Sequence, residues 1–366
     1  MSKIIFTGGG TGGHVFPIIA IAQSIRERDP NISMSYIGPK DFTANVFLPE
    51  AKIKTNYILS GKIRRYFSFK AIISNIVDIF FNIPVGFFHS FFIMFFTMPD
   101  LIISKGGYGS IPVIFSGIIL RIPIFIHESD VAPGVANRIG SHFAEKIFTS
   151  FSSEITEYFP KKKMIQTGGP VRKKIINWNN EDVLKLKGGK DVIFIIGGSQ
   201  GSEKINDVIF QSLEDLLKDF EVIHQTGFKD INRAKKESAA MIDKDLLEYY
   251  HPLFFLDENE LACAYNSSQV VIGRAGGGTI SEISAVGKPS ILIPLANSAQ
   301  NHQVKNAYAY AENGACLVLE EPNFTGHFLL EKLKTIERDK MSKAAKEFFP
   351  LNASEKISKE ILDYLI

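Results

Sequence analysis

The sequence predicts an α/β protein of two domains, each built on a parallel sheet with helices on both faces. Its length of 366 residues exceeds what one hydrophobic core usually fills and favours about two domains. Short runs rich in Ile, Val and Phe alternate with helix-length segments, as in parallel sheets buried on both faces. The pattern occurs twice, on either side of a Lys-, Gly- and Pro-rich stretch at 160–170, where we place the linker.

Ten apolar runs are predicted to be strands because they are continuous, β-branched and bounded by turn residues. The first half contributes Lys3–Thr7, Ser33–Ile37, Asp100–Ser104, Pro123–His127 and Lys146–Thr149. The second half contributes Asp191–Ile196, Phe220–Gln225, Gln269–Gly273, Ser290–Pro294 and Ala315–Leu319. The tail, Ala353–Ile366, has apolar residues at helical spacing, which predicts a last helix.

Composition excludes several classes of protein. With 45% hydrophobic and 22% charged residues, the chain is too apolar to be disordered, and a net charge of +2 is too small for an electrostatic nucleic-acid binder. Cys263 and Cys316 have no metal-ligand spacing, so we expect buried free thiols in a reducing compartment. The apolar run Ile4–Thr7 is too short for a signal peptide, so we expect a cytoplasmic chain.

A glycine-rich loop, Gly8–Gly13, follows the first strand and precedes a predicted helix from His14 to about Arg28, with Pro17 in its first turn. Such a junction lets backbone N–H groups and a helix N-terminus face an anion closely, which indicates a phosphate or pyrophosphate site. The same glycines satisfy the G-x-G-x-x-G dinucleotide pattern. That alternative expects an acidic residue at the end of the second strand, where the chain has Ile37–Lys40 instead.

The second half of the sequence contains two further junctions of a strand, a glycine-rich loop and a helix. Strand Asp191–Ile196 leads into Gly197–Gly201, and strand Gln269–Gly273 leads into Arg274–Thr279 and a further helix. The N-terminus of that helix could bind a pyrophosphate. Glu282, one turn further on, could accept both hydroxyls of a ribose.

Seven sequence blocks, in order and with fitting spacing, resemble the MurG family of N-acetylglucosaminyltransferases over essentially the full chain. The resemblance implies a GT-B architecture, in which two Rossmann-like domains with parallel sheets face a cleft. It also implies that the last helix returns to the N-terminal domain, which gives domains 1–160 plus 350–366 and 161–349. The blocks are Gly9–Pro17, Gly106–Tyr108, His127–Asp130 with Pro133, Gly134 and Asn137, Gly169–Arg172, Gly197–Gly201, Arg274–Glu282, and Gln300–Gln303 with Asn306 and Ala307.

The resemblance assigns a donor site for UDP-N-acetylglucosamine to the C-terminal domain and an acceptor site for lipid I to the N-terminal one. Two positions depart from the common pattern: Ser129 and Asp130 replace a frequent Gln-Asn, and Ala275 replaces a frequent Ser. On the donor side the matching residues are Arg172, Ser199, Gly276, Gly277, Gly278, Thr279, Glu282, Gln303 and Asn306. On the acceptor side they are Thr11, Gly12, Gly13, His14, Tyr108, Glu128 and Asn137.

Sugar transfer from UDP needs charge relief on the departing diphosphate and a base for the incoming hydroxyl. Helix N-termini and oriented amides can supply the first, with Arg172 or Arg274 adding positive charge. The seven blocks contain no Asp-x-Asp pair, so we expect no metal or other cofactor. His14 is the leading base because an imidazole titrates near pH ~6.5, with Glu128 and Asp130 as competing bases.

Residues 61–100 hold ten of the 30 phenylalanines, and 79–99 carry no formal charge. That is long enough to span a bilayer, but Asn82, Pro84, Gly86 and His89 interrupt it near the middle. The favoured interpretation is one or two helices lying in the headgroup region of an anionic membrane. A spanning helix and buried core helices stay open as alternatives. The flanking basic residues are Lys62, Arg64, Arg65 and Lys70.

The predicted function is inverting transfer of N-acetylglucosamine from its UDP form to the muramoyl 4-hydroxyl of lipid I. The product, lipid II, feeds peptidoglycan synthesis and hence cell shape and division. The resemblance implies a peripheral enzyme on the cytoplasmic membrane face, with other cell-wall synthesis and division proteins as candidate partners. One alternative is a UDP-sugar transferase or epimerase with a soluble acceptor. Another is a non-catalytic membrane-recruiting subunit, which would tolerate loss of His14 and of Arg274–Glu282.

Overall fold

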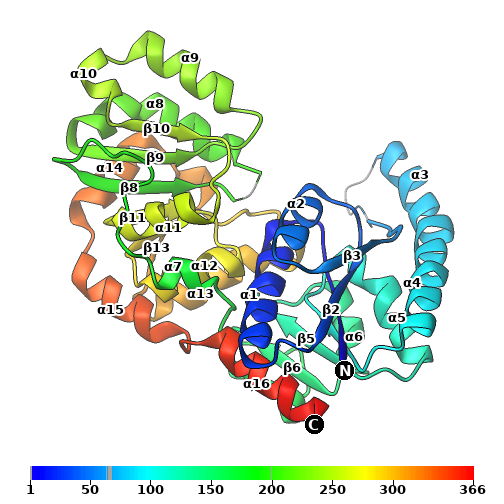
Figure 1. Cartoon of the computed structure of the whole chain (residues 1–366). Coiled ribbons are helices and arrows are strands. Elements are labelled where there is room, and N and C mark those ends of the chain that lie inside the picture. Colours follow the sequence, from blue (N-terminus) through cyan, green and yellow to red (C-terminus); the bar gives the residue numbers. More distant parts are fainter. Residues whose placement is uncertain (1, 63, 65–67, 199) are drawn as a thin grey trace. The chain divides into compact units, whose positions relative to one another are not determined.

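The chain forms two compact α/β units, each with its own parallel sheet (Figure 1). The computed structural model describes residues 2–62, 64, 68–198 and 200–366. Unit 1 comprises Met1–Pro170 and Pro350–Ile366, and unit 2 comprises Val171–Phe349. The predicted fold class is therefore confirmed.

Unit 1 contains a seven-stranded sheet in the order β3-β2-β1-β4-β5-β6-β7, and all neighbouring strands are parallel. The strand order reverses direction between β1 and β4, as in doubly wound folds. The strands are β1 (Lys3–Thr7), β2 (Ser33–Gly38), β3 (Lys54–Tyr57), β4 (Leu101–Ser104), β5 (Ile124–Glu128), β6 (Lys146–Thr149) and β7 (Met164–Gln166).

Unit 1 has six helices between its strands and one at the C-terminal end of the chain, within the described residues. They are α1 (Gly12–Arg28), α2 (Phe42–Glu50), α3 (Phe69–Val77), α4 (Ile83–Thr97), α5 (Ile111–Ile119), α6 (Val135–Gly140) and α16 (Ala353–Leu365). A π-helical turn, η1 (Asp78–Asn82), joins α3 to α4, and short 3₁₀ turns lie at Tyr108–Ser110 and Lys161–Lys163. Because α1 begins at Gly12, Pro17 lies in its second turn; its placement in the first turn was wrong.

Unit 2 contains a six-stranded parallel sheet in the order β10-β9-β8-β11-β12-β13. The strands are β8 (Asp191–Ile196), β9 (Phe220–Gln225), β10 (Tyr250–Leu253), β11 (Val270–Gly273), β12 (Ser290–Leu292) and β13 (Leu317–Val318). The helices are α7 (Lys173–Ile176), α8 (Glu203–Asp219), α9 (Ile231–Met241), α10 (Lys244–Leu247), α11 (Glu258–Ser267), α12 (Gly277–Val286), α13 (His302–Glu312), α14 (Gly326–Thr335) and α15 (Arg338–Phe348), with 3₁₀ turns at Ala299–Asn301 and Glu321–Asn323.

Strand β1 shows why the sheets are buried on both faces. Successive side chains of a strand point to opposite faces, so Ile4 and Phe6 enter one hydrophobic cluster and Ile5 enters another. All three are buried. A strand in this position carries apolar residues on both faces, which explains the continuous apolar runs of the sequence.

The linker region belongs structurally to unit 1. Strand β7 pairs with β6, with Ile147 opposite Met164 and Thr149 opposite Gln166. Residues 161–170 therefore pack with the first sheet, and the change of unit falls ten residues beyond the boundary expected at 160.

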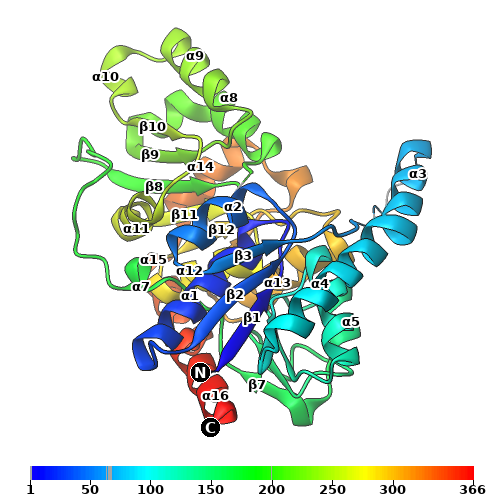
Figure 2. The same cartoon turned by 45° about the vertical axis from the view of Figure 1, so that its right-hand side comes forward.

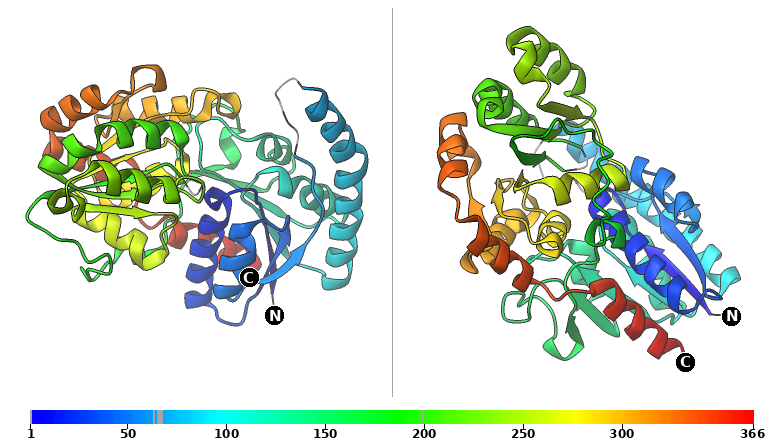
Figure 3. Two further views of the ribbon diagram at one scale, coloured as in Figure 1. Left: turned by 90° about the horizontal axis from the view of Figure 1, so that it is seen from above. Right: turned by 60° about the vertical axis from the view of Figure 1, so that its left-hand side comes forward.

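Helix α16 lies beside α1 (Figure 3). Its Ile357 and Ile361 are fully buried in the cluster that also holds Ile4 and Phe6. The hydroxyls of Ser24 and Ser358 form a buried hydrogen bond of 2.9 Å between the two helices. The last helix thus completes the core of unit 1.

Replacing Ile361 with alanine is expected to lower the free energy of unfolding of unit 1 by about 2–5 kcal/mol, because it removes a fully buried side chain and leaves a cavity. Denaturant titration followed by circular dichroism measures this loss. The matched control is Lys359→Ala, which truncates an exposed side chain of the same helix. Equal stability of the two variants would show that α16 does not contribute to the core.

Helices α3 and α4 continue one another along the side of unit 1, next to α5 (Figure 2). Within the described ranges, Phe69–Thr97 is one helical segment that is long and apolar enough to cross a membrane, by length and composition only. Only 17% of its most apolar window is buried, so most of this segment is exposed. The hydroxyls of Ser90 and Ser116 hold α4 to α5 at 2.8 Å.

Candidate active site

The predicted acceptor residues of unit 1 lie at the carboxyl ends of three neighbouring strands, β1, β4 and β5. The carboxyl ends of parallel strands meet at one edge of the sheet, where ligands of open α/β folds bind. The loops concerned are Gly8–Thr11 after β1, Lys105–Gly107 after β4, and Ser129–Gly134 after β5. The topology therefore gathers residues that are more than 100 positions apart in the chain.

The rings of His14 and Tyr108 lie against glycine backbone. A Cβ added to Gly107 would lie 3.2 Å from Nε2 of His14, and one added to Gly10 would lie 2.6 Å from Cε1 of Tyr108. Both glycines have positive φ, at +83° and +101°, which also disfavours a side chain. Thr11 Oγ1 is 3.1 Å from His14 Nδ1 and orients the imidazole.

Glu128, at the end of β5, accepts three hydrogen bonds. Its Oε1 accepts from the backbone N–H of Asp130 at 3.1 Å, and its Oε2 accepts from Gly134 N at 3.3 Å and Asn137 Nδ2 at 3.0 Å. Burial raises the pKa of the Glu128 carboxyl to about 6; the charge of Asp130 adds to the rise, and the charge of Lys105 opposes it. A carboxyl with this pKa can exchange a proton close to neutral pH.

The turn at Gly106 and Gly107 contacts both His14 and Asn137, the hydrogen-bond partner of Glu128. A Cβ on Gly106 would lie 2.7 Å from Asn137 Nδ2, as one on Gly107 would meet the His14 ring. The structure thus brings Thr11, His14 and Tyr108 to one side of this turn, and Asn137 with Glu128 to the other. Gly12 and Gly13 form the first turn of α1, and Asp130 is half-buried.

The predicted phosphate loop of unit 2 forms the N-terminus of α12. Gly276 is the residue that precedes the helix, and Gly277, Gly278 and Thr279 form its first turn. A Cβ on Gly276 or Gly278 would meet nothing within 4 Å, so the space beside these two residues is open. The first N–H groups of a helix and its dipole favour an anion there.

Glu282 lies in the second turn of α12 and faces two polar side chains. Tyr265 donates to its Oε2 at 2.9 Å, and Arg172 NH2 lies 3.5 Å from its Oε1. Burial raises the pKa of this carboxyl, while Arg172 and Tyr265 oppose the rise. Arg172 is itself buried, so this ion pair fixes the carboxylate behind the phosphate loop.

Arg274, two residues before Gly276, forms hydrogen bonds with three neighbouring groups. It donates to the carbonyl of Ile293 at 3.0 Å, to Ser202 Oγ at 2.7 Å and to Glu321 Oε1 at 2.6 Å. Ser202 precedes α8 and accepts from Ile205 N as its N-cap. In this arrangement Arg274 is paired with Glu321, as Arg172 is paired with Glu282.

Gln303 and Asn306 of α13 hold neighbouring loops. Gln303 Oε1 accepts from Leu295 N at 3.0 Å. Asn306, fully buried, donates to the carbonyl of Ala275 at 3.0 Å, directly before the phosphate loop. Ser199, predicted at the donor, lies outside the described residues.

Both halves of the chain match one enzyme family. Residues 4–149 match the glycosyltransferase family 28 N-terminal domain, and residues 192–361 match its C-terminal domain. The chain belongs to glycosyltransferase family 28. This family 28 chain is 36% identical to the UDP-N-acetylglucosamine–N-acetylmuramyl-(pentapeptide) pyrophosphoryl-undecaprenol N-acetylglucosamine transferase 2 of Bacillus cereus, over 93% of the chain and 92% of the relative. It is 34% identical to the corresponding transferase of Clostridium kluyveri, with the same coverage.

Solved structures agree in fold. MurG of Acinetobacter baumannii superposes with a TM-score of 0.73 at 24% identity, over 99% of this family 28 chain and all of the other. A putative UDP-N-acetylglucosamine 2-epimerase of Listeria monocytogenes gives 0.71 at 14% identity, covering 99% and 96%. Transferases and epimerases thus share the GT-B fold, so the fold alone does not separate them.

Several residues around the sites were not predicted from the sequence. In unit 1 of this family 28 chain they are Tyr36, which donates to the carbonyl of Gly8 at 2.8 Å, and Asp41, which accepts from Gly10 N at 3.0 Å. In unit 2 Tyr265 holds Glu282. Lys105 is enclosed near Glu128. Only Lys105 carries a visible signal, a single charge directly after an apolar strand.

Proposed function

We propose that unit 2 binds the donor and unit 1 the acceptor of one reaction. The chain is an N-acetylglucosaminyltransferase that moves N-acetylglucosamine from its UDP form to lipid I and so makes lipid II. The observation that carries this function is 34–36% identity over more than nine-tenths of the chain to transferases named for that reaction. The solved epimerase shares the fold of this chain but is only 14% identical to it. This likeness does not favour the alternative function of an epimerase.

At the donor, the diphosphate of UDP is proposed to lie at the N-terminus of α12. The open space beside Gly276 and Gly278 and the helix dipole support this placement. Glu282 then accepts the ribose hydroxyls, and Arg172 neutralises charge as the bond to the leaving diphosphate breaks. Gln303 and Asn306 are proposed to hold the N-acetylglucosamine, and Ser199 to approach the donor, from the family resemblance alone.

At the acceptor, His14 is proposed to take the proton from the muramoyl 4-hydroxyl as that oxygen attacks the sugar carbon. Its orientation by Thr11 and its place beside the Gly107 backbone support this role. Glu128 and Asp130 are the alternative bases. Tyr108, Asn137 and the α1 N-terminus, with Gly12 and Gly13, are proposed to position lipid I.

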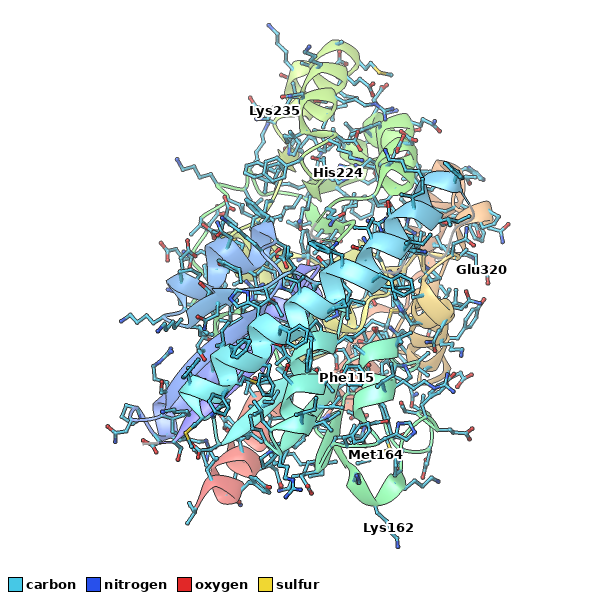
Figure 4. All side chains as sticks on the ribbon, turned by 90° about the vertical axis from the view of Figure 1, so that its right-hand side faces the viewer. Phe115, Lys162, Met164, His224, Lys235 and Glu320 are labelled. Atoms are coloured by element: carbon cyan, nitrogen blue, oxygen red, sulfur yellow. The ribbon has the colours of Figure 1, made fainter. Side chains whose placement is uncertain are left out.

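The long helix of unit 1 is proposed to lie in the headgroup region of an anionic membrane at its cytoplasmic face. Figure 4 looks onto this side, where α3 and α4 run across the surface next to Phe115 of α5. Asp78, inside the segment, is buried and ion-paired with Arg64 at 2.7 Å. A charged pair there would be costly in a bilayer centre, which favours an interfacial helix over a spanning one. Association with cell-wall synthesis and division proteins rests on the resemblance alone.

Transfer of labelled N-acetylglucosamine from its UDP form to a short-chain lipid I analogue tests the function, with hydrolysis of the donor measured alongside. The expected result is a labelled disaccharide product well above hydrolysis. Epimerisation of the donor without transfer, or binding without turnover, would contradict it.

Glu282→Gln is expected to weaken UDP and UDP-N-acetylglucosamine by a similar factor of roughly 10–100, because the proposed contact is to the ribose. Charge-assisted hydrogen bonds contribute about 1.5–3 kcal/mol, and Gln keeps the shape and one acceptor. The loss should appear in the donor KM, since ribose binding is equal in ground and transition states. Calorimetry with UDP and steady-state kinetics measure it.

The matched control is Glu312→Gln, an exposed carboxylate on α13. If UDP binds the Glu282 variant normally while turnover collapses, Glu282 acts on the sugar or on the chemistry, and the proposed nucleotide position is incorrect.

A further inference from the structure

A buried histidine joins two polar side chains in unit 2. His224 lies on β9, is fully buried, and is labelled in Figure 4. Its Nδ1 lies 3.0 Å from the Tyr250 hydroxyl, and its Nε2 lies 3.1 Å from Asn206 Oδ1. Tyr250 belongs to β10 and Asn206 to α8, so the three side chains connect two strands with a helix that packs on them. Burial lowers the pKa of His224 to about 3, so the imidazole is neutral near neutral pH and one nitrogen donates while the other accepts.

The hydrogen bonds of Asn206 determine which nitrogen of His224 carries the proton. Asn206 Nδ2 donates to the carbonyl of Thr226 at 2.8 Å and to Asp230 Oδ2 at 2.7 Å. Both of its N–H groups therefore face acceptors, and its Oδ1 must accept. We assign the proton to His224 Nε2, which donates to Asn206, and Nδ1 then accepts from the Tyr250 hydroxyl. The donors thus run in one direction, from the tyrosine to the carbonyl of Thr226.

The carbonyl of Thr226 lies against the glycine loop that follows β8. A Cβ added to Gly201 would lie 2.2 Å from this oxygen, and one added to Gly227 would lie 2.4 Å from the carbonyl oxygen of Gln200. Both glycines have positive φ, at +78° and +82°, a conformation that glycine adopts at low cost. The two backbones are in direct contact, so a displacement of Thr226 would displace Gly201.

The same glycine loop lies at the edge of the sheet that carries the phosphate loop. Strands β8 and β11 are paired, with Ile196 opposite Gly273, so the loops that follow them leave the sheet side by side. Arg274 donates to the hydroxyl of Ser202 at 2.7 Å, which joins the start of α8 to the loop before α12. The backbone of Gly201, directly before Ser202, therefore lies next to the proposed donor site.

We propose that His224 is a positioning residue for the donor. Its Nε2–H holds the Asn206 amide in the orientation that fixes the Thr226 carbonyl, and this carbonyl supports the backbone of Gly201 beside the diphosphate. Tyr250 favours the tautomer of His224 that donates to Asn206. This role deepens the proposed function and rests on the glycine loop after β8 facing the donor. His224 acts through other residues, so the effect falls on donor binding.

The test compares substitutions of His224 by the KM for UDP-N-acetylglucosamine and the KM for a lipid I analogue, at a temperature where circular dichroism shows each variant folded. The amide of glutamine reaches about as far as Nε2 and can still donate to Asn206, whereas that of asparagine reaches only about as far as Nδ1. His224→Gln should keep the donor KM within about twofold of wild type. His224→Asn and His224→Leu should raise it about tenfold, because the buried Oδ1 of Asn206 loses its donor. The acceptor KM should not change.

Two further measurements separate positioning from stability. Calorimetry should show weaker UDP binding to His224→Asn than to His224→Gln. Nitrogen NMR of histidine-labelled wild type should show His224 as the Nε2–H tautomer. Tyr250→Phe, which removes only the hydroxyl, should raise the donor KM by a smaller factor than His224→Leu, and it is the second variant if substitutions of His224 do not fold.

The matched control is His251→Leu, in the same sheet. His251 Nε2 lies 2.7 Å from Oε1 of the buried Glu221, and Glu221 is the second residue of β9, at the amino ends of the strands and away from both loops. This variant also loses a histidine hydrogen bond of unit 2. It should lower the free energy of unfolding and leave the donor KM unchanged.

Four results would overturn the proposal. An unchanged donor KM in His224→Asn, His224→Leu and Tyr250→Phe, with a lower free energy of unfolding, would show that these hydrogen bonds only stabilise unit 2. Equal donor KM values in His224→Gln and His224→Asn would show that the Nε2 contact does not affect the loop. A raised donor KM in His251→Leu would assign the effect to the sheet as a whole, and an Nδ1–H tautomer would contradict the assigned direction. Failure of the proposed function is distinguishable, because wild type would then transfer no sugar.

Discussion

Replacing His14 with alanine is expected to lower turnover about 100-fold or more, with little change in affinity for UDP-N-acetylglucosamine. General-base catalysis typically contributes about 10²–10⁴-fold, and the proposed proton transfer involves the acceptor only. The imidazole sits between the Thr11 hydroxyl and the Gly107 backbone, so alanine removes the ring without disturbing a core. Steady-state kinetics with the lipid I analogue, together with calorimetric titration of UDP, separate the two effects.

The control for His14 is His327→Ala, an exposed histidine on α14, which should leave turnover unchanged. Near-normal turnover of the His14 variant would indicate that Asp130 or Glu128 is the general base. A parallel loss of UDP affinity would instead mean that His14 acts on the donor.

Serine substitution of four exposed phenylalanines on α4 is expected to release the protein from anionic vesicles and to leave transfer to a water-soluble acceptor largely intact. Partial burial of such a ring contributes about 1–2 kcal/mol, so four rings together change partitioning by orders of magnitude. Phe87 and Phe91 are unsuitable, because they are half-buried against neighbouring rings. The chosen residues are Phe88, Phe92, Phe95 and Phe96, which are 54–78% exposed.

Vesicle sedimentation measures this release, and Phe143→Ser, an exposed ring of unit 1 away from α4, is the control. Insoluble variant protein would indicate that the helix is packed as core. Wild-type protein that resists carbonate extraction would indicate a spanning helix.

The central strands of both sheets could be predicted because each of them is buried on both faces and must be apolar throughout. The sequence does not predict β3, β7 and β10, which are edge strands with one neighbour each. Their sequences, KTNY, MIQ and YHPL, mix polar and apolar residues because one side of an edge strand is uncovered. No continuous apolar run marks these three strands. The remaining edge strand, β13, could be predicted because it lies in the apolar run Ala315–Leu319.

The candidate site likewise has some features that the local sequence predicts and others that depend on contacts between distant residues. Glycine loops after strands are local signals, and they located the loops at Gly8, Gly197 and Gly276. The partners that set the charge of these sites are distant in sequence. Tyr265 reaches Glu282 from the preceding helix α11, and Tyr36 of β2 donates to the carbonyl of Gly8. Such pairs depend on the folded sheet order, so the sequence shows the loops better than their electrostatics.

The return of α16 to unit 1 sets an order of events on the ribosome. The helix that covers α1 and supplies Ile357 and Ile361 to its core is translated only after the whole of unit 2, residues 171–349. At about 5–20 residues per second, that interval is roughly 10–40 s. During it the nascent unit 1 presents the uncovered apolar face of α1, and by its end all strands of unit 2 have been made. Unit 2 can therefore finish folding first, although it is made second.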